Sequence, residues 1–159
     1  MSDEGASPEE QLLSACMMDQ PHLVKELLRG QQPVNVNFKN GLGFTALHYA
    51  AQQGSVECVK ALVGARGLQP NIQDNLEGDT PLHKALTHCD SSETALEIAK
   101  LLVSAGADPR IVNREKQRPV NLTEPEEEDI RRLLLQATLA LQIRHDKVEG
   151  TEDGDYSSD

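Results

Sequence analysis

The chain of 159 residues has few aromatic side chains: two phenylalanines, two tyrosines and no tryptophan. This scarcity argues against one large aromatic core and favours packing built from leucine, valine and alanine. No apolar run approaches the roughly 18 residues that a membrane-spanning helix needs. The acidic N-terminus lacks the apolar segment of an ordinary secretory signal, so we expect a cytoplasmic location, a nuclear location or both.

Cysteine is also scarce. Cys16, Cys58 and Cys89 show no paired spacing of the kind that a disulfide framework or a zinc site requires. We therefore expect reduced thiols in an intracellular protein. Cys16 and Cys58 occupy positions that are small or apolar in equivalent parts of the chain, which predicts that they are buried. Cys89 falls in an insertion and is expected to be more exposed.

The formal net charge of −11 at pH 7 is concentrated at the two ends of the chain. Four acidic residues lie in residues 1–10 and five in residues 148–159, so the remaining 137 residues carry a net charge of only −2. Acidic ends raise solubility and repel nucleic acid, and lysine and arginine form no stripe that would bind DNA or RNA. A basic protein client that binds the acidic tail stays open as an alternative.

A repeated pattern defines the middle of the chain. The tetrapeptide TALH at residues 45–48 returns as TPLH at residues 80–83, and Gly43 and Gly78 precede the two copies by two residues. A degenerate copy, RPVN, follows at residues 118–121. Repetition at a period of about 30–40 residues is typical of stacked helical units, which bury their apolar faces against one another.

These motifs resemble those of the ankyrin-repeat family over residues 8–135. The resemblance implies a pair of antiparallel helices and a projecting hairpin in each repeat. It further implies that the threonine and histidine of the motif hydrogen-bond around the start of the first helix, which assigns Thr45, His48, Thr80 and His83 to structure. The opening SPEE sequence at residues 7–10 and the acidic tail also resemble small stand-alone fungal ankyrin-repeat proteins.

We therefore expect an all-α ankyrin-repeat solenoid of about four helix-turn-helix repeats. Their approximate bounds are 8–39, 40–74, 75–112 and 113–145, and the two outer repeats are degenerate, as end units of a stack are. Acidic disordered segments are expected at residues 1–7 and 146–159.

Local signals mark the ends of individual helices. Ser7, Pro8 and Glu10 match a capping box that begins the first helix. Gly54 is expected to end the first helix of its repeat in the left-handed conformation. Asp19 stands at the matching place in the preceding repeat, where it tolerates that conformation less well.

The last helix is predicted from about residue 126 to residue 145, with Thr123 as its cap and acidic residues in its first turn. It carries two apolar stripes. One is expected to close the core and consists of Ile130, Leu133, Leu134, Ala137 and Leu141. The other, made of Leu135, Leu139 and Ile143, either folds against the solenoid or binds a partner.

Catalytic and metal sites have little support in the sequence. His48 and His83 are explained by the repeat motif, and the HCD triplet at residues 88–90 cannot surround one ion because its members are adjacent. The acidic run at residues 124–129 is better explained by the first turn of a helix than by a calcium site. We therefore expect no enzymatic activity, no cofactor and no metal.

Protein binding is the expected function, because repeat arrays present a concave surface of hairpin tips and first helices. The tips fall near residues 38–44, 75–79 and 113–117. Phe44 and Tyr49 are expected at the surface as contacts, whereas Phe38 and Leu42 either join them or pack under the loop. The candidate partner-binding residues are Phe44, Tyr49, Gln52, Leu76, Asp79, Lys84 and His88.

The third repeat departs from the regular length by five extra residues, which we place in a lengthened loop within residues 88–94. Lengthened loops often carry function. The whole pattern favours a monomeric intracellular adaptor or scaffold that binds one or more proteins. The alternatives are an escort or assembly chaperone for a basic client, or an inhibitor similar to the ankyrin-type kinase inhibitors, which is an analogy of fold and length alone.

Overall fold

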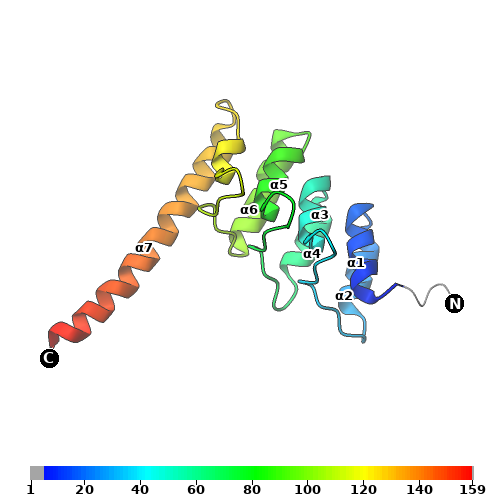
Figure 1. Cartoon of the computed structure of the whole chain (residues 1–159), viewed down its shortest axis with the longest axis horizontal. Coiled ribbons are helices and arrows are strands. Elements are labelled where there is room, and N and C mark those ends of the chain that lie inside the picture. Colours follow the sequence, from blue (N-terminus) through cyan, green and yellow to red (C-terminus); the bar gives the residue numbers. More distant parts are fainter. Residues whose placement is uncertain (1–5, 159) are drawn as a thin grey trace.

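The computed structural model describes the backbone of residues 6–158 and the side chains of residues 6–145. Its elements are helices stacked in pairs along one axis, and no β-strand occurs among the described residues (Figure 1). Within this part of the chain, no helix combines the length and the apolar character that crossing a membrane requires. In chain order the elements are α1 (Pro8–Met17), α2 (Pro21–Arg29), α3 (Ala46–Gln53), α4 (Val56–Val63), α5 (Pro81–His88), α6 (Ser92–Ser104), the 3-10 turn η2 (Pro119–Leu122) and α7 (Glu128–Ser158).

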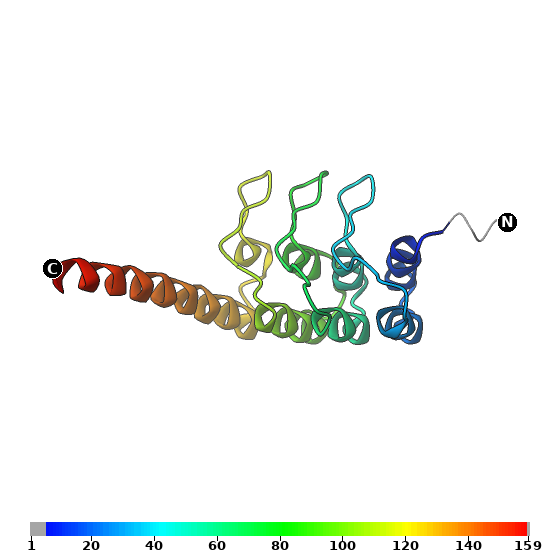
Figure 2. The same ribbon diagram turned by 90° about the horizontal axis from the view of Figure 1, so that it is seen from below.

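The helices form two layers. The first helices of the repeats, α1, α3, α5 and η2, contact one another in sequence, and the second helices, α2, α4, α6 and α7, do the same. Hairpins project side by side from the layer of first helices (Figure 2). Leucine, valine, isoleucine and small alanine side chains fill the space between the layers, as the scarcity of aromatic residues predicts. The all-α ankyrin-repeat solenoid is confirmed.

Each hairpin is closed by a polar side chain at its base. The Oδ1 atoms of Asn40, Asp74 and Asn113 accept hydrogen bonds from backbone N–H groups two to four residues later. Backbone bonds then join successive tips: the Asn75 N–H donates to the Leu42 carbonyl and the Arg114 N–H donates to the Glu77 carbonyl, both at 2.9 Å. The tips are therefore held in a row rather than left as independent loops.

Gly43 illustrates how tightly neighbouring tips approach. Its φ of +82° lies in the left-handed region, and a Cβ atom added there would stand 2.7 Å from the backbone nitrogen of Asn75. Only glycine satisfies both the conformation and the contact. Gly54 ends α3 with a φ of 71°, and Asp19 adopts a φ of 53° at the matching place after α1. The predicted left-handed conformation of Gly54 is confirmed, and Asp19 adopts the same conformation although its side chain makes it less favourable.

The threonine and histidine of each central motif cap the helix that they begin. The Thr45 N–H donates to His48 Nδ1 at 3.1 Å, and the His48 N–H donates back to Thr45 Oγ1 at 3.3 Å. Because Nδ1 accepts a hydrogen bond, the ring proton lies on Nε2, which donates to the Asp79 carbonyl at 2.9 Å. His48 thus closes its own helix cap and also binds the hairpin of the next repeat.

The same arrangement recurs one repeat later. Thr80 and His83 form the equivalent cap, and His83 Nε2 lies 2.9 Å from the Gln117 carbonyl in the following hairpin. Both histidines are fully buried. Their assignment to structure, which the family resemblance implied, agrees with these contacts.

The first repeat uses other residues for the same two tasks. Ser7 and Glu10 make the predicted capping box, with reciprocal bonds of 3.1 and 3.2 Å. The neighbouring Glu9 carboxylate accepts from the Asn35 N–H at 2.8 Å, which ties α1 to the chain that enters the next repeat. Residues 7–10 thus take the place of the threonine-to-histidine motif in the first repeat.

The fourth repeat is more reduced than expected, because its first helix is only the 3-10 turn η2. Thr123 was predicted to cap the last helix, and this is wrong: its hydroxyl donates to the Val120 carbonyl at the end of η2. Instead, the Glu127 carbonyl accepts the first bond of α7 from Arg131, and its carboxylate accepts from the Glu124 N–H at 2.7 Å. An intervening turn through residues 124–127 explains why α7 begins two residues later than predicted.

Helix α7 runs to Ser158 rather than ending near residue 145, and it extends away from the stack (Figure 1). No proline interrupts residues 126–158, and extending an existing helix is far less costly than starting one. The predicted bounds of a disordered tail at 146–159 remain a prediction, and most of the expected N-terminal segment lies outside the described residues. Ile130 and Leu134 are buried in the core, whereas Leu135, Leu139 and Ile143 are exposed.

Replacing His48 by asparagine should separate the two roles of the ring. The side chain of Asn121 already caps η2 by accepting from the Arg118 N–H at 2.8 Å, so asparagine can keep the cap but cannot reach the next hairpin. We expect His48→Asn to lower the free energy of unfolding by about 1–3 kcal/mol, because the buried Asp79 carbonyl loses its donor. Urea denaturation measures this, with the exposed His22→Asn as the matched control. Equal stability of the two variants would contradict the bridging role.

Acid should destabilise the protein partly through the same residue. Burial lowers the pKa of His48 below its usual 6.5, and this effect outweighs the nearby carbonyl and carboxylates. The unfolded chain therefore binds a proton more readily, and stability falls as the pH drops below about 6.5, by at most about 1.4 kcal/mol per pH unit from this group. Unfolding curves between pH 7.5 and 5 should have a smaller pH slope in His48→Asn. Identical slopes in both proteins would exclude the effect.

Candidate protein-binding surface

A groove of about 360 Å³ opens on the hairpin side of the third and fourth repeats. Its walls come from two successive hairpins and its end from helix α5 and the turn η2. Backbone hydrogen bonds between the tips fix the separation of the walls. The lining residues are Leu76, Glu77, Asp79, Thr87, His88, Asn113, Arg114, Glu115, Gln117 and Leu122.

The candidate residues divide into two groups by exposure. Leu76 is 53% exposed at a hairpin tip, His88 is exposed at the end of α5, and Gln52 is half-exposed on α3. These three can meet a partner. The other four are buried: Phe44, Tyr49, Asp79 and Lys84.

Phe44 and Tyr49 were expected at the surface, and this is wrong. They are only 6% and 8% exposed, their ring centroids lie 5.0 Å apart, and the Phe44 ring also contacts His48 at 5.4 Å. The Tyr49 hydroxyl accepts from Asn40 Nδ2 at 2.8 Å. Phe44 directly precedes the cap residue Thr45, so its side chain turns under the hairpin and joins the core.

The two residues left open in the same hairpin behave differently. Phe38 is half-buried and packs against the core, whereas Leu42 is exposed at the tip. The first hairpin therefore offers one aliphatic side chain rather than an aromatic cluster. An aromatic anchor for a partner is not available there.

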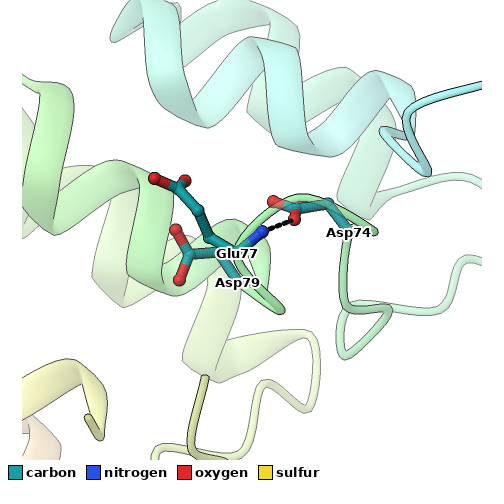
Figure 3. Close-up of side chains that lie close together, drawn as sticks. All are labelled: Asp74, Glu77 and Asp79. Carbon is teal, nitrogen blue, oxygen red and sulfur yellow. Dashed lines mark hydrogen bonds between the residues drawn. The ribbon is translucent and has the colours of Figure 1, made fainter. Parts of the chain in front are cut away.

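Lys84 and Asp79 were predicted as contacts, but they belong to a buried ionic cluster. The Lys84 ammonium lies 2.8 Å from Glu77 Oε1 and 3.4 Å from one carboxylate oxygen each of Asp74 and Asp79. It also stands 4.9 Å above the Phe44 ring of the preceding repeat, a cation–π contact. The three carboxylates share one hairpin (Figure 3). Lys84 thus joins its own hairpin to α5 and to the preceding repeat.

The charges in this cluster stabilise one another. Burial alone would lower the pKa of Lys84, but the carboxylates of Glu77, Asp74 and Asp79 outweigh burial and raise it. The pKa of Glu77 is lowered, first by its hydrogen bond from Lys84. Burial opposes ionisation of Asp74, but the Glu77 N–H and the Lys84 charge keep its pKa below the usual value. Lys84, Glu77 and Asp74 are therefore ionised at neutral pH.

Asp74, Glu77 and Asp79 are also the one group of side chains, among those described, whose ligand atoms converge closely enough to hold a metal ion; these atoms lie within 4.8 Å of one another. The Lys84 ammonium lies within 3.4 Å of each of them. It already supplies one positive charge at the place where a metal ion would have to bind. Acidic residues in a hairpin followed five to ten residues later by a lysine were the sequence signal for this cluster, and it was not recognised.

The extra residues of the third repeat do not form a long loop. Helix α5 ends at His88, and the Ser91 side chain caps α6 by accepting from the Glu93 and Thr94 N–H groups. The insertion lengthens α6 to 13 residues, against 8 in α4. Cys89 is half-buried, and its thiol donates to the Ala51 carbonyl at 3.5 Å. Cys16 and Cys58 are buried, as predicted.

Lys84→Met should reveal how strongly the cluster depends on its cation. Removing the ammonium leaves Asp74 and Asp79 buried without compensation, so we expect a loss of about 3–5 kcal/mol in the free energy of unfolding. The control is Lys60→Met, at an exposed i,i+3 pair with Glu57, where we expect a change below about 1 kcal/mol. Thermal and urea unfolding of both variants would decide. A loss no larger than that of the control would mean that Lys84 is dispensable.

The sequence of residues 12–113 matches the family model described as ankyrin repeats (3 copies). The chain is 32% identical over 169 residues to the ankyrin repeat-containing protein YGL242C of Saccharomyces cerevisiae, covering 100% of this chain and 93% of the yeast protein. It is also 38% identical over 88 residues to protein phosphatase 1 regulatory subunit 27 of Mus musculus, which is 55% of this chain and 53% of that protein. Ankyrin repeats are generally protein-interaction modules and are typically not catalytic. On its motif, its fold and these similarities, the chain belongs to the ankyrin-repeat family.

Proposed function

We propose that the protein is a non-enzymatic adaptor that binds a protein partner by the hairpin tips and the groove between them. The observation that carries this proposal is the groove of about 360 Å³ with the exposed Leu76 on its wall. Its floor is rigid because His83 and the Lys84 cluster fix the hairpins to α5. A preorganised surface loses little conformational freedom on binding. His88 lines the groove at the end of α5, and the half-exposed Gln52 on α3 is proposed to extend the surface along the first helices.

Other roles within the binding class have weaker support. The excess of acidic residues at the ends of the chain favours an escort for a basic client. An ankyrin-type kinase inhibitor rests on fold and size alone. The similarity to the phosphatase regulatory subunit adds one more alternative, that the chain regulates a phosphatase. That similarity covers about half of each chain. We favour a monomeric adaptor that acts in the cytoplasm or nucleus. Binding in the groove does not depend on the acidic ends of the chain, whereas the escort role does.

Affinity capture from cell extract with matched variants tests the adaptor role. The full chain is compared with the double variant Leu76→Ser, His88→Ala and with Leu135→Ser, which removes an equally exposed leucine from α7. We expect the groove variant to bind its partner roughly 5 to 30 times more weakly, the effect of losing about 1–2 kcal/mol of binding free energy. The α7 variant should bind as well as the unchanged chain. The reverse pattern would place binding on α7 and contradict the proposal.

The identities of the captured proteins separate the alternatives. A varied set of proteins favours the adaptor. Basic ribosomal clients would favour the escort, a kinase the inhibitor, and a phosphatase the regulatory subunit. Melting curves of the variants should match that of the unchanged chain, because all three side chains are exposed.

A further inference from the structure

We propose that the groove between the hairpins of the third and fourth repeats selects a partner segment that carries a lysine or arginine next to an aliphatic side chain. This inference rests on the proposed function and specifies the partner chemistry of the same surface. It follows from two leucines and an excess of negatively charged side chains that line the same groove. Neither feature alone would define the ligand.

The apolar surface of the groove consists of two leucines. Leu76 stands exposed at the tip of one hairpin, and the half-buried Leu122 lies where η2 closes the groove. An aliphatic side chain of the partner that covers Leu76 removes apolar surface from water, worth about 25 cal/mol for each Å² buried. This contact provides affinity but little selectivity, because any aliphatic group fulfils it.

Selectivity comes from the carboxylates. Glu77, Asp79 and Glu115 line the groove, and Arg114 is the only lysine or arginine among its lining residues. Arg114 keeps its positive charge while its Nη1 donates to the neutral Leu76 carbonyl at 3.3 Å, so one cation stands against three carboxylate side chains. Because negative charge is in excess, an acidic segment would be repelled and a basic one attracted.

The buried cluster leaves this excess unchanged. Beyond Glu77 and Asp79, which already line the groove, it adds one carboxylate, Asp74, and one ammonium, Lys84, which lies 3.4 Å from Asp74 Oδ2. The Glu77 side chain is 62% exposed, so a second cation can approach it from the groove while Lys84 holds it from within. A hydrated metal ion would compete poorly there, because Lys84 occupies the centre of the three carboxylates.

The test uses the full chain and a positional-scanning library of synthetic octapeptides immobilised on an array. We expect peptides that combine Lys or Arg with a neighbouring Leu, Ile or Val to be enriched. Glu115→Gln and Glu77→Gln should each reduce the preference for Lys and Arg by roughly threefold to fivefold, the effect of one exposed charge pair. Raising the salt concentration should reduce it as well. The control is Glu97→Gln, an exposed glutamate on α6 outside the groove.

Absence of basic enrichment, including absence of peptide binding, would overturn the inference. The same holds if Glu97→Gln weakens the preference as much as Glu115→Gln. Because Glu77 contacts Lys84, its variant can lose stability. Among the described residues the Glu115 side chain forms no ion pair with Lys84, so Glu115→Gln keeps the test decisive. Capture with the Leu76 and His88 variants decides separately whether the groove binds protein at all.

Discussion

The stack depends on the histidine of the repeat motif, because its imidazole ring makes contacts in two successive repeats. In His48 and His83, Nδ1 closes the cap of the helix to which the residue belongs, and Nε2 reaches a carbonyl in the next hairpin. The two nitrogens lie on different edges of one rigid ring, so the start of a helix and the following hairpin are fixed relative to each other. Backbone hydrogen bonds between successive hairpin tips then hold neighbouring hairpins at the same separation. A surface built from separate hairpins becomes continuous for this reason.

Lys84 follows His83 directly and adds an electrostatic connection to the same place. Its ammonium holds the carboxylates of one hairpin and contacts the Phe44 ring of the preceding repeat. This position explains the division among the candidate contacts. Side chains at the interface between repeats, such as Phe44 and Lys84, are buried and hold the repeats together. Side chains at the apex of a hairpin, such as Leu76, stay exposed and available to a partner.

The amino-acid sequence predicted those features that depend on neighbouring residues or on the repeat period. The Ser7 cap, the left-handed Gly54 and the helix pairs depend on residues within a few positions of one another, and each is confirmed. The surface position of Phe44 was wrong because its ring packs under Lys84 of the next repeat, 40 residues later in the chain. Lys84 is instead buried by the carboxylates of its own hairpin, five to ten residues earlier. Spacing showed the insertion in the third repeat. Its placement in α6 depended on the Ser91 cap, which a count of residues does not reveal.

The two ends show what the central histidine contributes, because each end keeps only the interactions it needs. At the start, Glu10 supplies the cap and Glu9 supplies the bond to the next repeat, so two residues divide the work of one ring. At the other end, Asn121 keeps the cap alone, and no further hairpin follows it within residues 6–158. A short amide is sufficient there, since no carbonyl of a next repeat has to be reached. The replacement of histidine by asparagine in the RPVN sequence is therefore a consequence of its place at the end of the stack.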